Sequence, residues 1–194
     1  MNPSRLTLIV LLAIALTAPA AAPAQTRGNP AELIAKQRTA LARLAFLDGT
    51  WRGPAWTILP SGEKHTITQT ERVGPLLDGS VRLIEGRGYE ADHTTAFNAL
   101  AVVSYDPAKD AFNLRSYAQG RSGDFVLTPT ADGFTWEIPA GPMTIRYTAV
   151  IKDGTWRETG ARLAPGQEPV RFFEMELRRV GETAWPGEGV VGAE

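Results

Sequence analysis

The hydrophobic pattern of the chain changes its period at Trp51. Between residues 30 and 44, apolar side chains recur at helical spacing, and Asn29 followed by Pro30 is typical of a helix start. From Trp51 onward apolar and polar residues alternate, which is the period of a β-strand. The pattern therefore predicts one amphipathic helix followed by an all-β domain, and we expect the helix to cover one end of that domain.

Turn signals divide the alternating region into ten short segments. Asp78-Gly79, Asp132-Gly133 and Asp153-Gly154 are the strongest signals, because Asp-Gly fills the positive-φ positions of tight hairpin turns. Strands are expected near residues 51–59, 64–74, 80–89, 97–105, 111–119, 124–130, 134–139, 143–152, 155–162 and 170–180. Short connections favour antiparallel up-and-down order, and so many strands favour closure into a ten-stranded barrel. A two-sheet sandwich is the alternative architecture.

The hairpins also predict which side chains face the interior, because directly opposed residues share a face of the sheet. A two-residue turn at Asp153-Gly154 places Tyr147 and Glu158 on the inner face, and the same arithmetic applies at the other two turns. The side chains expected in the barrel lumen are Gln69, Glu71, Trp136, Tyr147, Trp156 and Glu158. Gly86, Gly88 and Gly160 lie opposite or beside the polar members, so we expect them to leave space in the lumen.

The N-terminus has the pattern of a secretory signal peptide. Arg5 precedes an apolar run at residues 6–16, and Ala22-Pro23-Ala24 is a cleavage site of the A-x-A type. We therefore expect a signal peptide at 1–24, a leader with the amphipathic helix at 25–47, a β-barrel domain at 48–180 and a flexible tail at 181–194. The protein is expected to be periplasmic or secreted. The apolar run is shorter than the roughly 20 residues of a spanning helix, so no stable membrane insertion of the mature chain is expected.

Composition removes several kinds of partner and chemistry. Lys and Arg together number 20 against 21 Asp and Glu, so no basic surplus attracts nucleic acid. The absence of cysteine excludes disulfides, thiolate catalysis and Cys-based metal sites. The two histidines, His65 and His93, are too few for a His-based metal site, and no metal ligand is predicted.

Gly49-Thr50-Trp51 at the head of the strands, with Arg178 and Arg179 near their end, resembles the lipocalins and the wider calycin group. The resemblance implies that Trp51 packs at the closed end of the barrel under a basic residue of the last strand. Strand alternation selects Arg179 for that role. The segment ALAVVSYDPAKDAF is similar to a family of secreted bacterial lipocalin-like proteins of unknown function.

The same resemblance bears on cofactors. Ten-stranded calycins include the fatty-acid-binding proteins and the nitrobindins, which ligate haem through a histidine in their C-terminal strands. Both histidines of this chain lie in its first half. No cofactor is therefore expected, haem included.

Three functional hypotheses follow. The preferred one is a lipocalin-like barrel that binds a small, mostly apolar ligand in its lumen, because an apolar cavity with few polar groups suits such a molecule. The first alternative is a lumenal acid–base enzyme using Glu71 or Glu158, although the sequence has no catalytic signature such as a nucleophile elbow. The second is a structural or interaction barrel filled by its own side chains. The lumen carboxylates are alternatively expected to pair with Arg162 or Arg179, or to lie at the wet mouth of the barrel. The ligand and the oligomeric state stay open.

Overall fold

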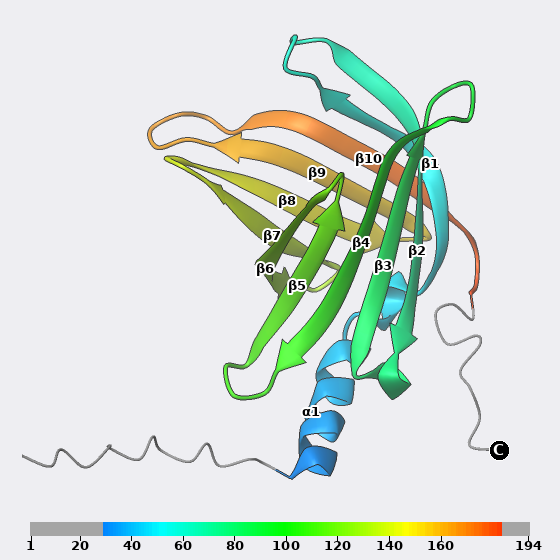
Figure 1. Ribbon diagram of the computed structural model, residues 1–194, viewed down its shortest axis with the longest axis vertical. Coiled ribbons are helices and arrows are strands. Elements are labelled where there is room, and N and C mark those ends of the chain that lie inside the picture. Colours follow the sequence, from blue (N-terminus) through cyan, green and yellow to red (C-terminus); the bar gives the residue numbers. More distant parts are fainter. Residues whose placement is uncertain (1–28, 184–194) are drawn as a thin grey trace, which may run out of the picture.

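A computed structural model describes residues 29–183 of the chain. Within them one helix precedes ten strands, which form a closed antiparallel barrel in up-and-down order, as predicted from the short connections (Figure 1). The sandwich alternative is wrong, because β1 pairs with β10 and closes the sheet. The signal peptide predicted at 1–24 and most of the tail predicted at 181–194 lie outside the described residues.

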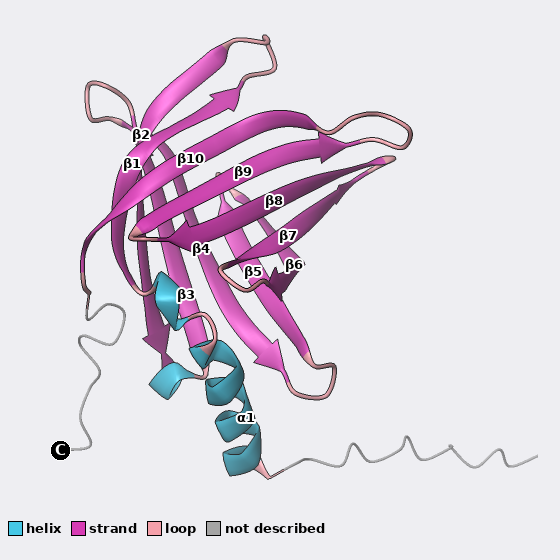
Figure 2. Ribbon diagram, turned by 180° about the vertical axis from the view of Figure 1, so that it is seen from behind, coloured by secondary structure: helices cyan, strands magenta, loops and turns pink. Residues whose placement is uncertain are grey.

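The strands follow the predicted positions closely. The helix α1 (Pro30–Ala42) is followed by a short 3-10 helix (Ala45–Leu47), and the strands are β1 (Gly49–Ile58), β2 (Lys64–Leu76), β3 (Val81–Tyr89), β4 (Thr95–Asp106), β5 (Ala111–Ala118), β6 (Arg121–Pro129), β7 (Gly133–Ala140), β8 (Met143–Lys152), β9 (Thr155–Leu163) and β10 (Val170–Gly181). Each strand pairs with its sequence neighbours, so the barrel is a simple meander (Figure 2).

Asp153-Gly154 forms the predicted tight turn, whereas Asp132-Gly133 does not. Asp153 and Gly154 have φ values of 51° and 70° and make the expected tight turn between β8 and β9. Asp132-Gly133 is not such a turn, because Gly133 is already the first residue of β7. A Cβ on Gly133 would lie 1.9 Å from the carbonyl oxygen of Ala149, so only glycine fits there. The pairing of β6 with β7 is shifted by two residues as a result, which keeps every predicted face.

The start of β6 was predicted too late. The strand begins at Arg121 and not near residue 124, because Gln119 and Gly120 have φ values of 49° and 75° and turn the chain in two residues. Gln-Gly is a weaker turn signal than Asp-Gly, since only its glycine favours positive φ.

The helix α1 covers the barrel end only with its C-terminal part. Leu41 and Leu44 are fully buried, whereas Leu33 and Ile34 are 37% and 40% exposed. Figures 1 and 2 show the N-terminal part of α1 standing away from the ends of the strands. The helical stripe predicted from the sequence therefore contacts the barrel from residue 37 onward, where the side-chain amide of Gln37 donates to the carbonyl oxygen of Tyr105 on β4.

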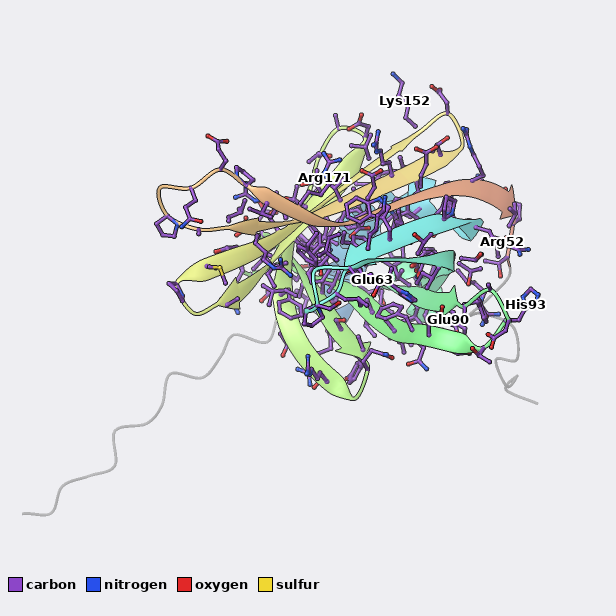
Figure 3. All side chains as sticks on the ribbon, turned by 90° about the horizontal axis from the view of Figure 1, so that it is seen from above. Arg52, Glu63, Glu90, His93, Lys152 and Arg171 are labelled. Carbon is purple, nitrogen blue, oxygen red and sulfur yellow. The ribbon has the colours of Figure 1, made fainter. Side chains whose placement is uncertain are left out.

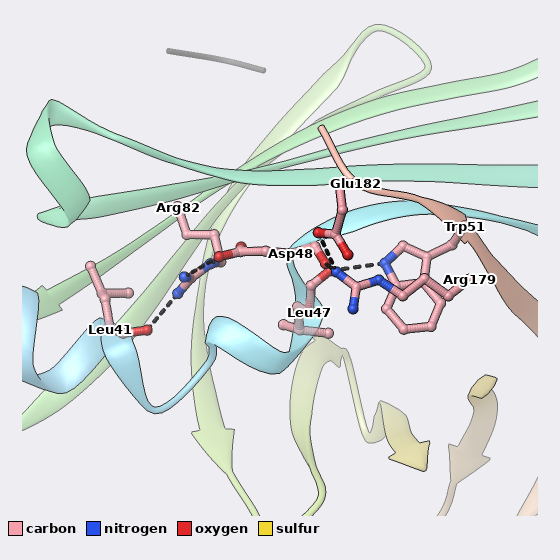
Figure 4. Close-up of polar contacts among 7 residues, drawn as sticks. All are labelled: Leu41, Leu47, Asp48, Trp51, Arg82, Arg179 and Glu182. Carbon is pink, nitrogen blue, oxygen red and sulfur yellow. Dashed lines mark hydrogen bonds and ion pairs between the residues drawn. The ribbon is translucent and has the colours of Figure 1, made fainter. Parts of the chain in front are cut away.

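Trp51 lies at the centre of this closed end (Figure 4). Its side chain is buried, and its indole N–H donates a 2.9 Å hydrogen bond to the carbonyl oxygen of Leu47. The guanidinium of Arg179 lies 5.7 Å from the centre of the Trp51 ring and also donates to the carbonyl oxygen of Asp48. Trp156 meets Trp51 edge to face, with 5.8 Å between ring centres. Trp51 on β1 therefore contacts both β10, through Arg179, and the 3-10 helix, through Leu47.

A buried arginine strengthens the closed end, and the sequence analysis did not predict it. Arg82 is on the inner face of β3, with only 5% of its side chain exposed. It donates to both carboxylate oxygens of Asp48, at 2.7 and 2.9 Å, and to the carbonyl oxygen of Leu41 (Figure 4). Alternation along β3 from Ile84 would have placed Arg82 inside. The fork of its guanidinium ties the end of α1 to the turn before β1.

The barrel wall is weakest between β6 and β7. Their pairing is limited to residues 127–129 opposite residues 134–136, whereas the other neighbouring strands pair over most of their length. Pro129 and Pro139 lie on these two strands, and proline cannot donate to a ladder. Residues 121–126 and 137–140 consequently pair on one side only. We call this opening the β6–β7 seam.

Candidate functional site

The six residues predicted for the lumen come from four strands, and the observed registers place all of them on the inner face. They are Gln69 and Glu71 on β2, Trp136 on β7, Tyr147 on β8, and Trp156 and Glu158 on β9. Glu71 and Glu158 are only 8% and 7% exposed. Trp136 and Tyr147 lie farther from the closed end and are partly exposed. The six residues form two groups, each built around one carboxyl.

The first group surrounds Glu158. The indole N–H of Trp136 donates to Oε1 of Glu158 at 3.3 Å, and the indole N–H of Trp156 donates to Oε2 at 3.2 Å. Tyr147 stacks on Trp136, with ring centres 4.3 Å apart and planes within 8°. A strand pleat explains the arrangement, because Trp136 opposes Tyr147 and residues 156 and 158 share one face of β9. The carboxyl is held by two neutral donors and lies against aromatic rings.

The second group surrounds Glu71. The side-chain amide of Gln69 donates to Oε1 of Glu71 at 2.7 Å. Gly86 faces Glu71 across the β2–β3 ladder, and a Cβ there would lie 2.7 Å from Oε1 and 3.0 Å from Oε2. The glycine therefore makes the room in which the Glu71 carboxyl lies.

The expectation that three glycines leave open space is wrong. The room beside Gly86 is taken by Glu71, that beside Gly88 by Ile67, and that beside Gly160 by Tyr147, each within 3.0 Å of where a Cβ would be. Glycines facing long inner side chains let those side chains cross the lumen.

Burial shifts the pKa of each polar lumen group. It raises the pKa of Glu71 to about 8, against the hydrogen bond from Gln69, and the charge of Glu158 adds to the rise. Burial likewise raises the pKa of Glu158 to about 7, although the two indole donors favour its charged form. Tyr147 has its pKa raised to about 12 by burial and by the charge of Glu158, so its phenol stays neutral. Near neutral pH the carboxyl pair is poised between protonated and charged forms.

Neither carboxyl has an arginine as a hydrogen-bond partner within residues 29–183. Arg179 binds the carbonyl of Asp48 and the carboxylate of Glu182, and the guanidinium of Arg162 lies 4.7 Å from the centre of the Phe172 ring. Within residues 29–183, the hydrogen bonds to Glu71 and Glu158 come only from Gln69, Trp136 and Trp156. The alternative pairing with Arg162 or Arg179 is therefore wrong.

The opposite wall of the lumen carries small side chains. Alternation along β4, β5 and β6 turns these residues inward: Ala99, Ala101, Ser116, Ala118 and Gly123. All five are partly exposed, although they face the inside of a barrel, so solvent reaches them from the open end. We call this half the mouth of the lumen. The closed half, by contrast, is filled by buried side chains such as Trp51, Phe134 and Leu177.

The small-residue wall and the aromatic ring nearest to it are absent from the predicted lumen residues. Phe125 on β6 packs against Trp136, with 5.4 Å between ring centres. No Asp-Gly turn lies between β4 and β5 or between β5 and β6, so no such register sorts the small residues of these strands. Alternation from Leu127, which was sorted, would have placed Phe125 inside.

Two hollows lie on the outer wall and do not include the candidate residues. One, of about 380 Å³, is lined by residues that include Arg52, Pro54 and Thr66. The other, of about 560 Å³, is lined by residues that include Arg87, Asn98 and Tyr117. Their linings mix polar side chains with apolar ones such as Pro54 and Leu100, and the lining of the second hollow also includes Ala99 and Ala118. Figure 3 shows Lys152 and His93 projecting away from the barrel wall.

The histidines lie apart from the lumen carboxyls. Nε2 of His65 is 3.1 Å from Oε1 of Glu90, and His93 lies in the loop between β3 and β4 with a φ of 67°. No group of three or more metal-ligating side chains occurs in the described part of the chain. None of the helices within residues 29–183 combines the length and apolarity needed to cross a membrane.

Comparisons with known proteins bear on the fold. No protein-family model matches the sequence, and no curated protein matches it. Among solved structures the chain is similar to the crystal structure of Rv2717c from M. tuberculosis, with a TM-score of 0.55 and 13% identity over 72% of this chain and 96% of that chain. At this identity the likeness shows a shared fold alone. It fits a lipocalin-like barrel.

Proposed function

We propose that this barrel binds a small, mostly apolar ligand in the mouth of its lumen. The observation that carries the proposal is the presence of two buried carboxyls on the inner face, neither with a basic hydrogen-bond partner within residues 29–183. Glu158 lies among three aromatic side chains, and Glu71 is bonded to Gln69. Burying a carboxyl costs free energy that an apolar side chain of similar size would not cost. A barrel that needed only a filled core would do better without them. A few polar groups on an apolar wall are what a small-molecule site requires.

The two walls of the mouth would contribute differently. The aromatic wall of Trp136 and Tyr147 and the small-residue wall of β4–β6 would bury the apolar body of the ligand, at about 25 cal/mol per Å² before the cost of association. The carboxyls would orient its polar end. The β6–β7 seam lies beside Phe125 and Trp136, so the wall there can widen without breaking a long ladder.

An apolar probe tests this proposal. A fluorescent naphthalene dye is expected to bind the wild-type protein, and Ala99→Phe is expected to weaken binding by about tenfold or more, because a large ring on the inner face overfills the mouth. The matched control is Ala161→Phe, which adds the same ring to the outer face of β9 and should leave binding unchanged. Fluorescence titration measures both. If the folded wild-type protein binds no dye, or both variants bind like wild type, the proposal fails and the filled-barrel hypothesis takes its place.

We also infer that the protein is exported to the periplasm or beyond, on the basis of the signal-peptide pattern. The mature chain is expected to begin at Gln25. N-terminal sequencing of protein recovered from the producing cell's periplasm or medium checks this. A chain that still begins with Met1 in that material would contradict it.

A lumenal acid–base enzyme is the second candidate, and the raised pKa values of the carboxyls favour it. A group with a pKa near the working pH is well suited to donate or accept a proton. Glu158, at about 7, would be the base, and Glu71, at about 8, the acid. A binding protein returns its ligand unchanged, whereas an enzyme alters it, so mass spectrometry of a ligand after incubation separates the two.

A further inference from the structure

We propose that the lumenal site recognises a protonated amine, so that the ligand is an amphiphile whose ammonium group binds to the buried carboxyls of the lumen, Glu71 and Glu158. The inference rests on the proposed function and names the polar end of the ligand. Three features support it: a carboxylate oxygen without a donor, aromatic rings beside Glu158, and the lack, within residues 29–183, of a cation bonded to either carboxyl.

The first feature is Oε2 of Glu71. Gln69 donates to Oε1, but no described residue donates to Oε2. Residues 29–183 contain no side-chain oxygen or nitrogen that is both sealed from solvent and without a hydrogen-bond partner. Oε2 must therefore keep contact with solvent, although the residue is more than nine-tenths buried. Oε2 can therefore accept a hydrogen bond from a ligand. An ammonium group has three N–H donors and could supply that bond.

The second feature is the aromatic surface beside Glu158. Trp136 and Tyr147 are stacked, and Trp136 and Trp156 aim their N–H groups at Glu158. A cation over the face of tryptophan or tyrosine is attracted by the ring, most strongly where water is excluded. The two indoles lie against Glu158 and direct their N–H groups at its carboxyl. A carboxyl beside aromatic rings suits an ammonium group better than a neutral or anionic one.

The third feature is the set of charged groups around the pair. On the inner face, Arg82 is occupied by Asp48, and Arg179 by Asp48 and Glu182. Arg162 faces the mouth beside Tyr147 and lies over Phe172, where it acts on Tyr147 and not on either carboxyl.

On the outer face, Glu85 adds to the negative potential at Glu71, but two arginines, Arg72 and Arg87, bind it there. Arg121 also has an inner-face position, opposite Ala118 at the exposed start of β6. No hydrogen bond or ion pair among the described residues joins a cation to the side chain of Glu71 or Glu158.

The proposal has a definite pH dependence. Without ligand, burial raises the pKa of Glu71 to about 8 and that of Glu158 to about 7. An ammonium group favours the charged carboxylates, so its binding lowers both pKa values and releases protons. Affinity therefore rises with pH through this range, by about tenfold for each unit of lowered pKa. The amine itself stays charged, since an alkylamine titrates near the lysine value of about 10.4.

Three probes of one chain length test the inference: n-octylamine, n-octanol and octanoate. Isothermal titration calorimetry of the wild-type protein is expected to show all three binding weakly at about pH 5.5. At about pH 8.5, octylamine should bind about tenfold tighter than octanol, with net proton release at neutral pH in buffers of different ionisation enthalpy. The binding of octanoate should weaken as the pH rises, because its negative charge is repelled by the ionised carboxylates.

Substitutions test whether the preference for octylamine comes from Glu71 and Glu158. Glu71→Gln and Glu158→Gln together should remove the preference for octylamine over octanol while octanol still binds. Glu63→Gln, in the exposed loop between β1 and β2, is the matched control and should keep the preference (Figure 3).

The outcomes separate the two proposals. If octanol binds and octylamine binds no tighter at high pH, the amine inference fails and the apolar site stands. If none of the three probes binds, the proposed function fails as well. A preference for octanoate that is lost in Arg162→Gln would overturn the amine inference in favour of an acidic head group at the mouth.

Discussion

Trp51→Ala is expected to lower the free energy of unfolding by about 3–5 kcal/mol, the usual cost of truncating a large aromatic side chain in a core. The residue is 2% exposed, packs edge to face on Trp156, and donates a hydrogen bond to Leu47. Alanine would leave a cavity at the closed end and an unpaired carbonyl oxygen on the 3-10 helix. Urea unfolding followed by far-UV circular dichroism measures the loss.

Arg179 provides the internal test of this result. Arg179→Ala should cost less, because the side chain is about one-third exposed and a cation over an aromatic ring at such a site is worth about 0.5–1 kcal/mol. The double variant should be less destabilised than the sum of the two single variants, since both remove the same contact. Arg178→Ala, on the outer face, is the control. Strictly additive losses for Trp51 and Arg179 would show that the ring contact contributes nothing.

A rise in pH from about 4.5 to about 8 is expected to destabilise the ligand-free barrel, by on the order of 5 kcal/mol. The ordinary carboxyl pKa of 4.5 applies to the unfolded chain, whereas the folded values are about 8 for Glu71 and about 7 for Glu158. Between these values the folded protein holds protons that the unfolded chain has released. The favourable contribution is thus complete below about pH 4.5 and is lost as the pH passes the folded values.

Two variants and one control check the direction of this pH dependence. Glu71→Gln and Glu158→Gln should each flatten the dependence and stabilise the barrel at about pH 8, because a neutral amide pays no ionisation cost in the lumen. Glu85→Gln should do the opposite near neutral pH, since Arg72 and Arg87 hold the pKa of Glu85 below its ordinary value on the outer face. Thermal melts across the pH range measure all three. A stability that rises between pH 5 and 8 in the wild-type protein would contradict the assigned pKa values.

Much of the barrel could be predicted because a strand has only two faces. Each Asp-Gly turn relates one strand to the next, and an error of two residues, as at Asp132-Gly133, leaves every face unchanged. Strand order followed from short connections. The inner positions of Glu71, Tyr147 and Glu158 came from the same arithmetic, and the registers reproduce them.

What the sequence could not predict depends on distances across the lumen. The ion pair between Arg82 and Asp48 joins residues that are 34 positions apart, and no local sequence pattern relates them. The Glu71 side chain occupies the space beside Gly86 only in a rotamer that extends from β2 over β3, and the sequence does not specify that rotamer. Pro129 lies within the short β6–β7 ladder and Pro139 lies beyond it, so neither proline marks in the sequence where the pairing stops.

The central claim is that a ligand enters the mouth of the lumen, and the indole N–H signals of the tryptophans test it most directly by NMR. During titration with octanol, the signals of Trp136 and Trp156 should shift together, because both donate to Glu158 beside the proposed site. The signal of Trp56, on the outer face under Lys64, should stay in place, and that of Trp51, bonded to Leu47 at the closed end, should move little. Shifts confined to Trp56, or no shift in any of these four signals, would contradict a lumenal site.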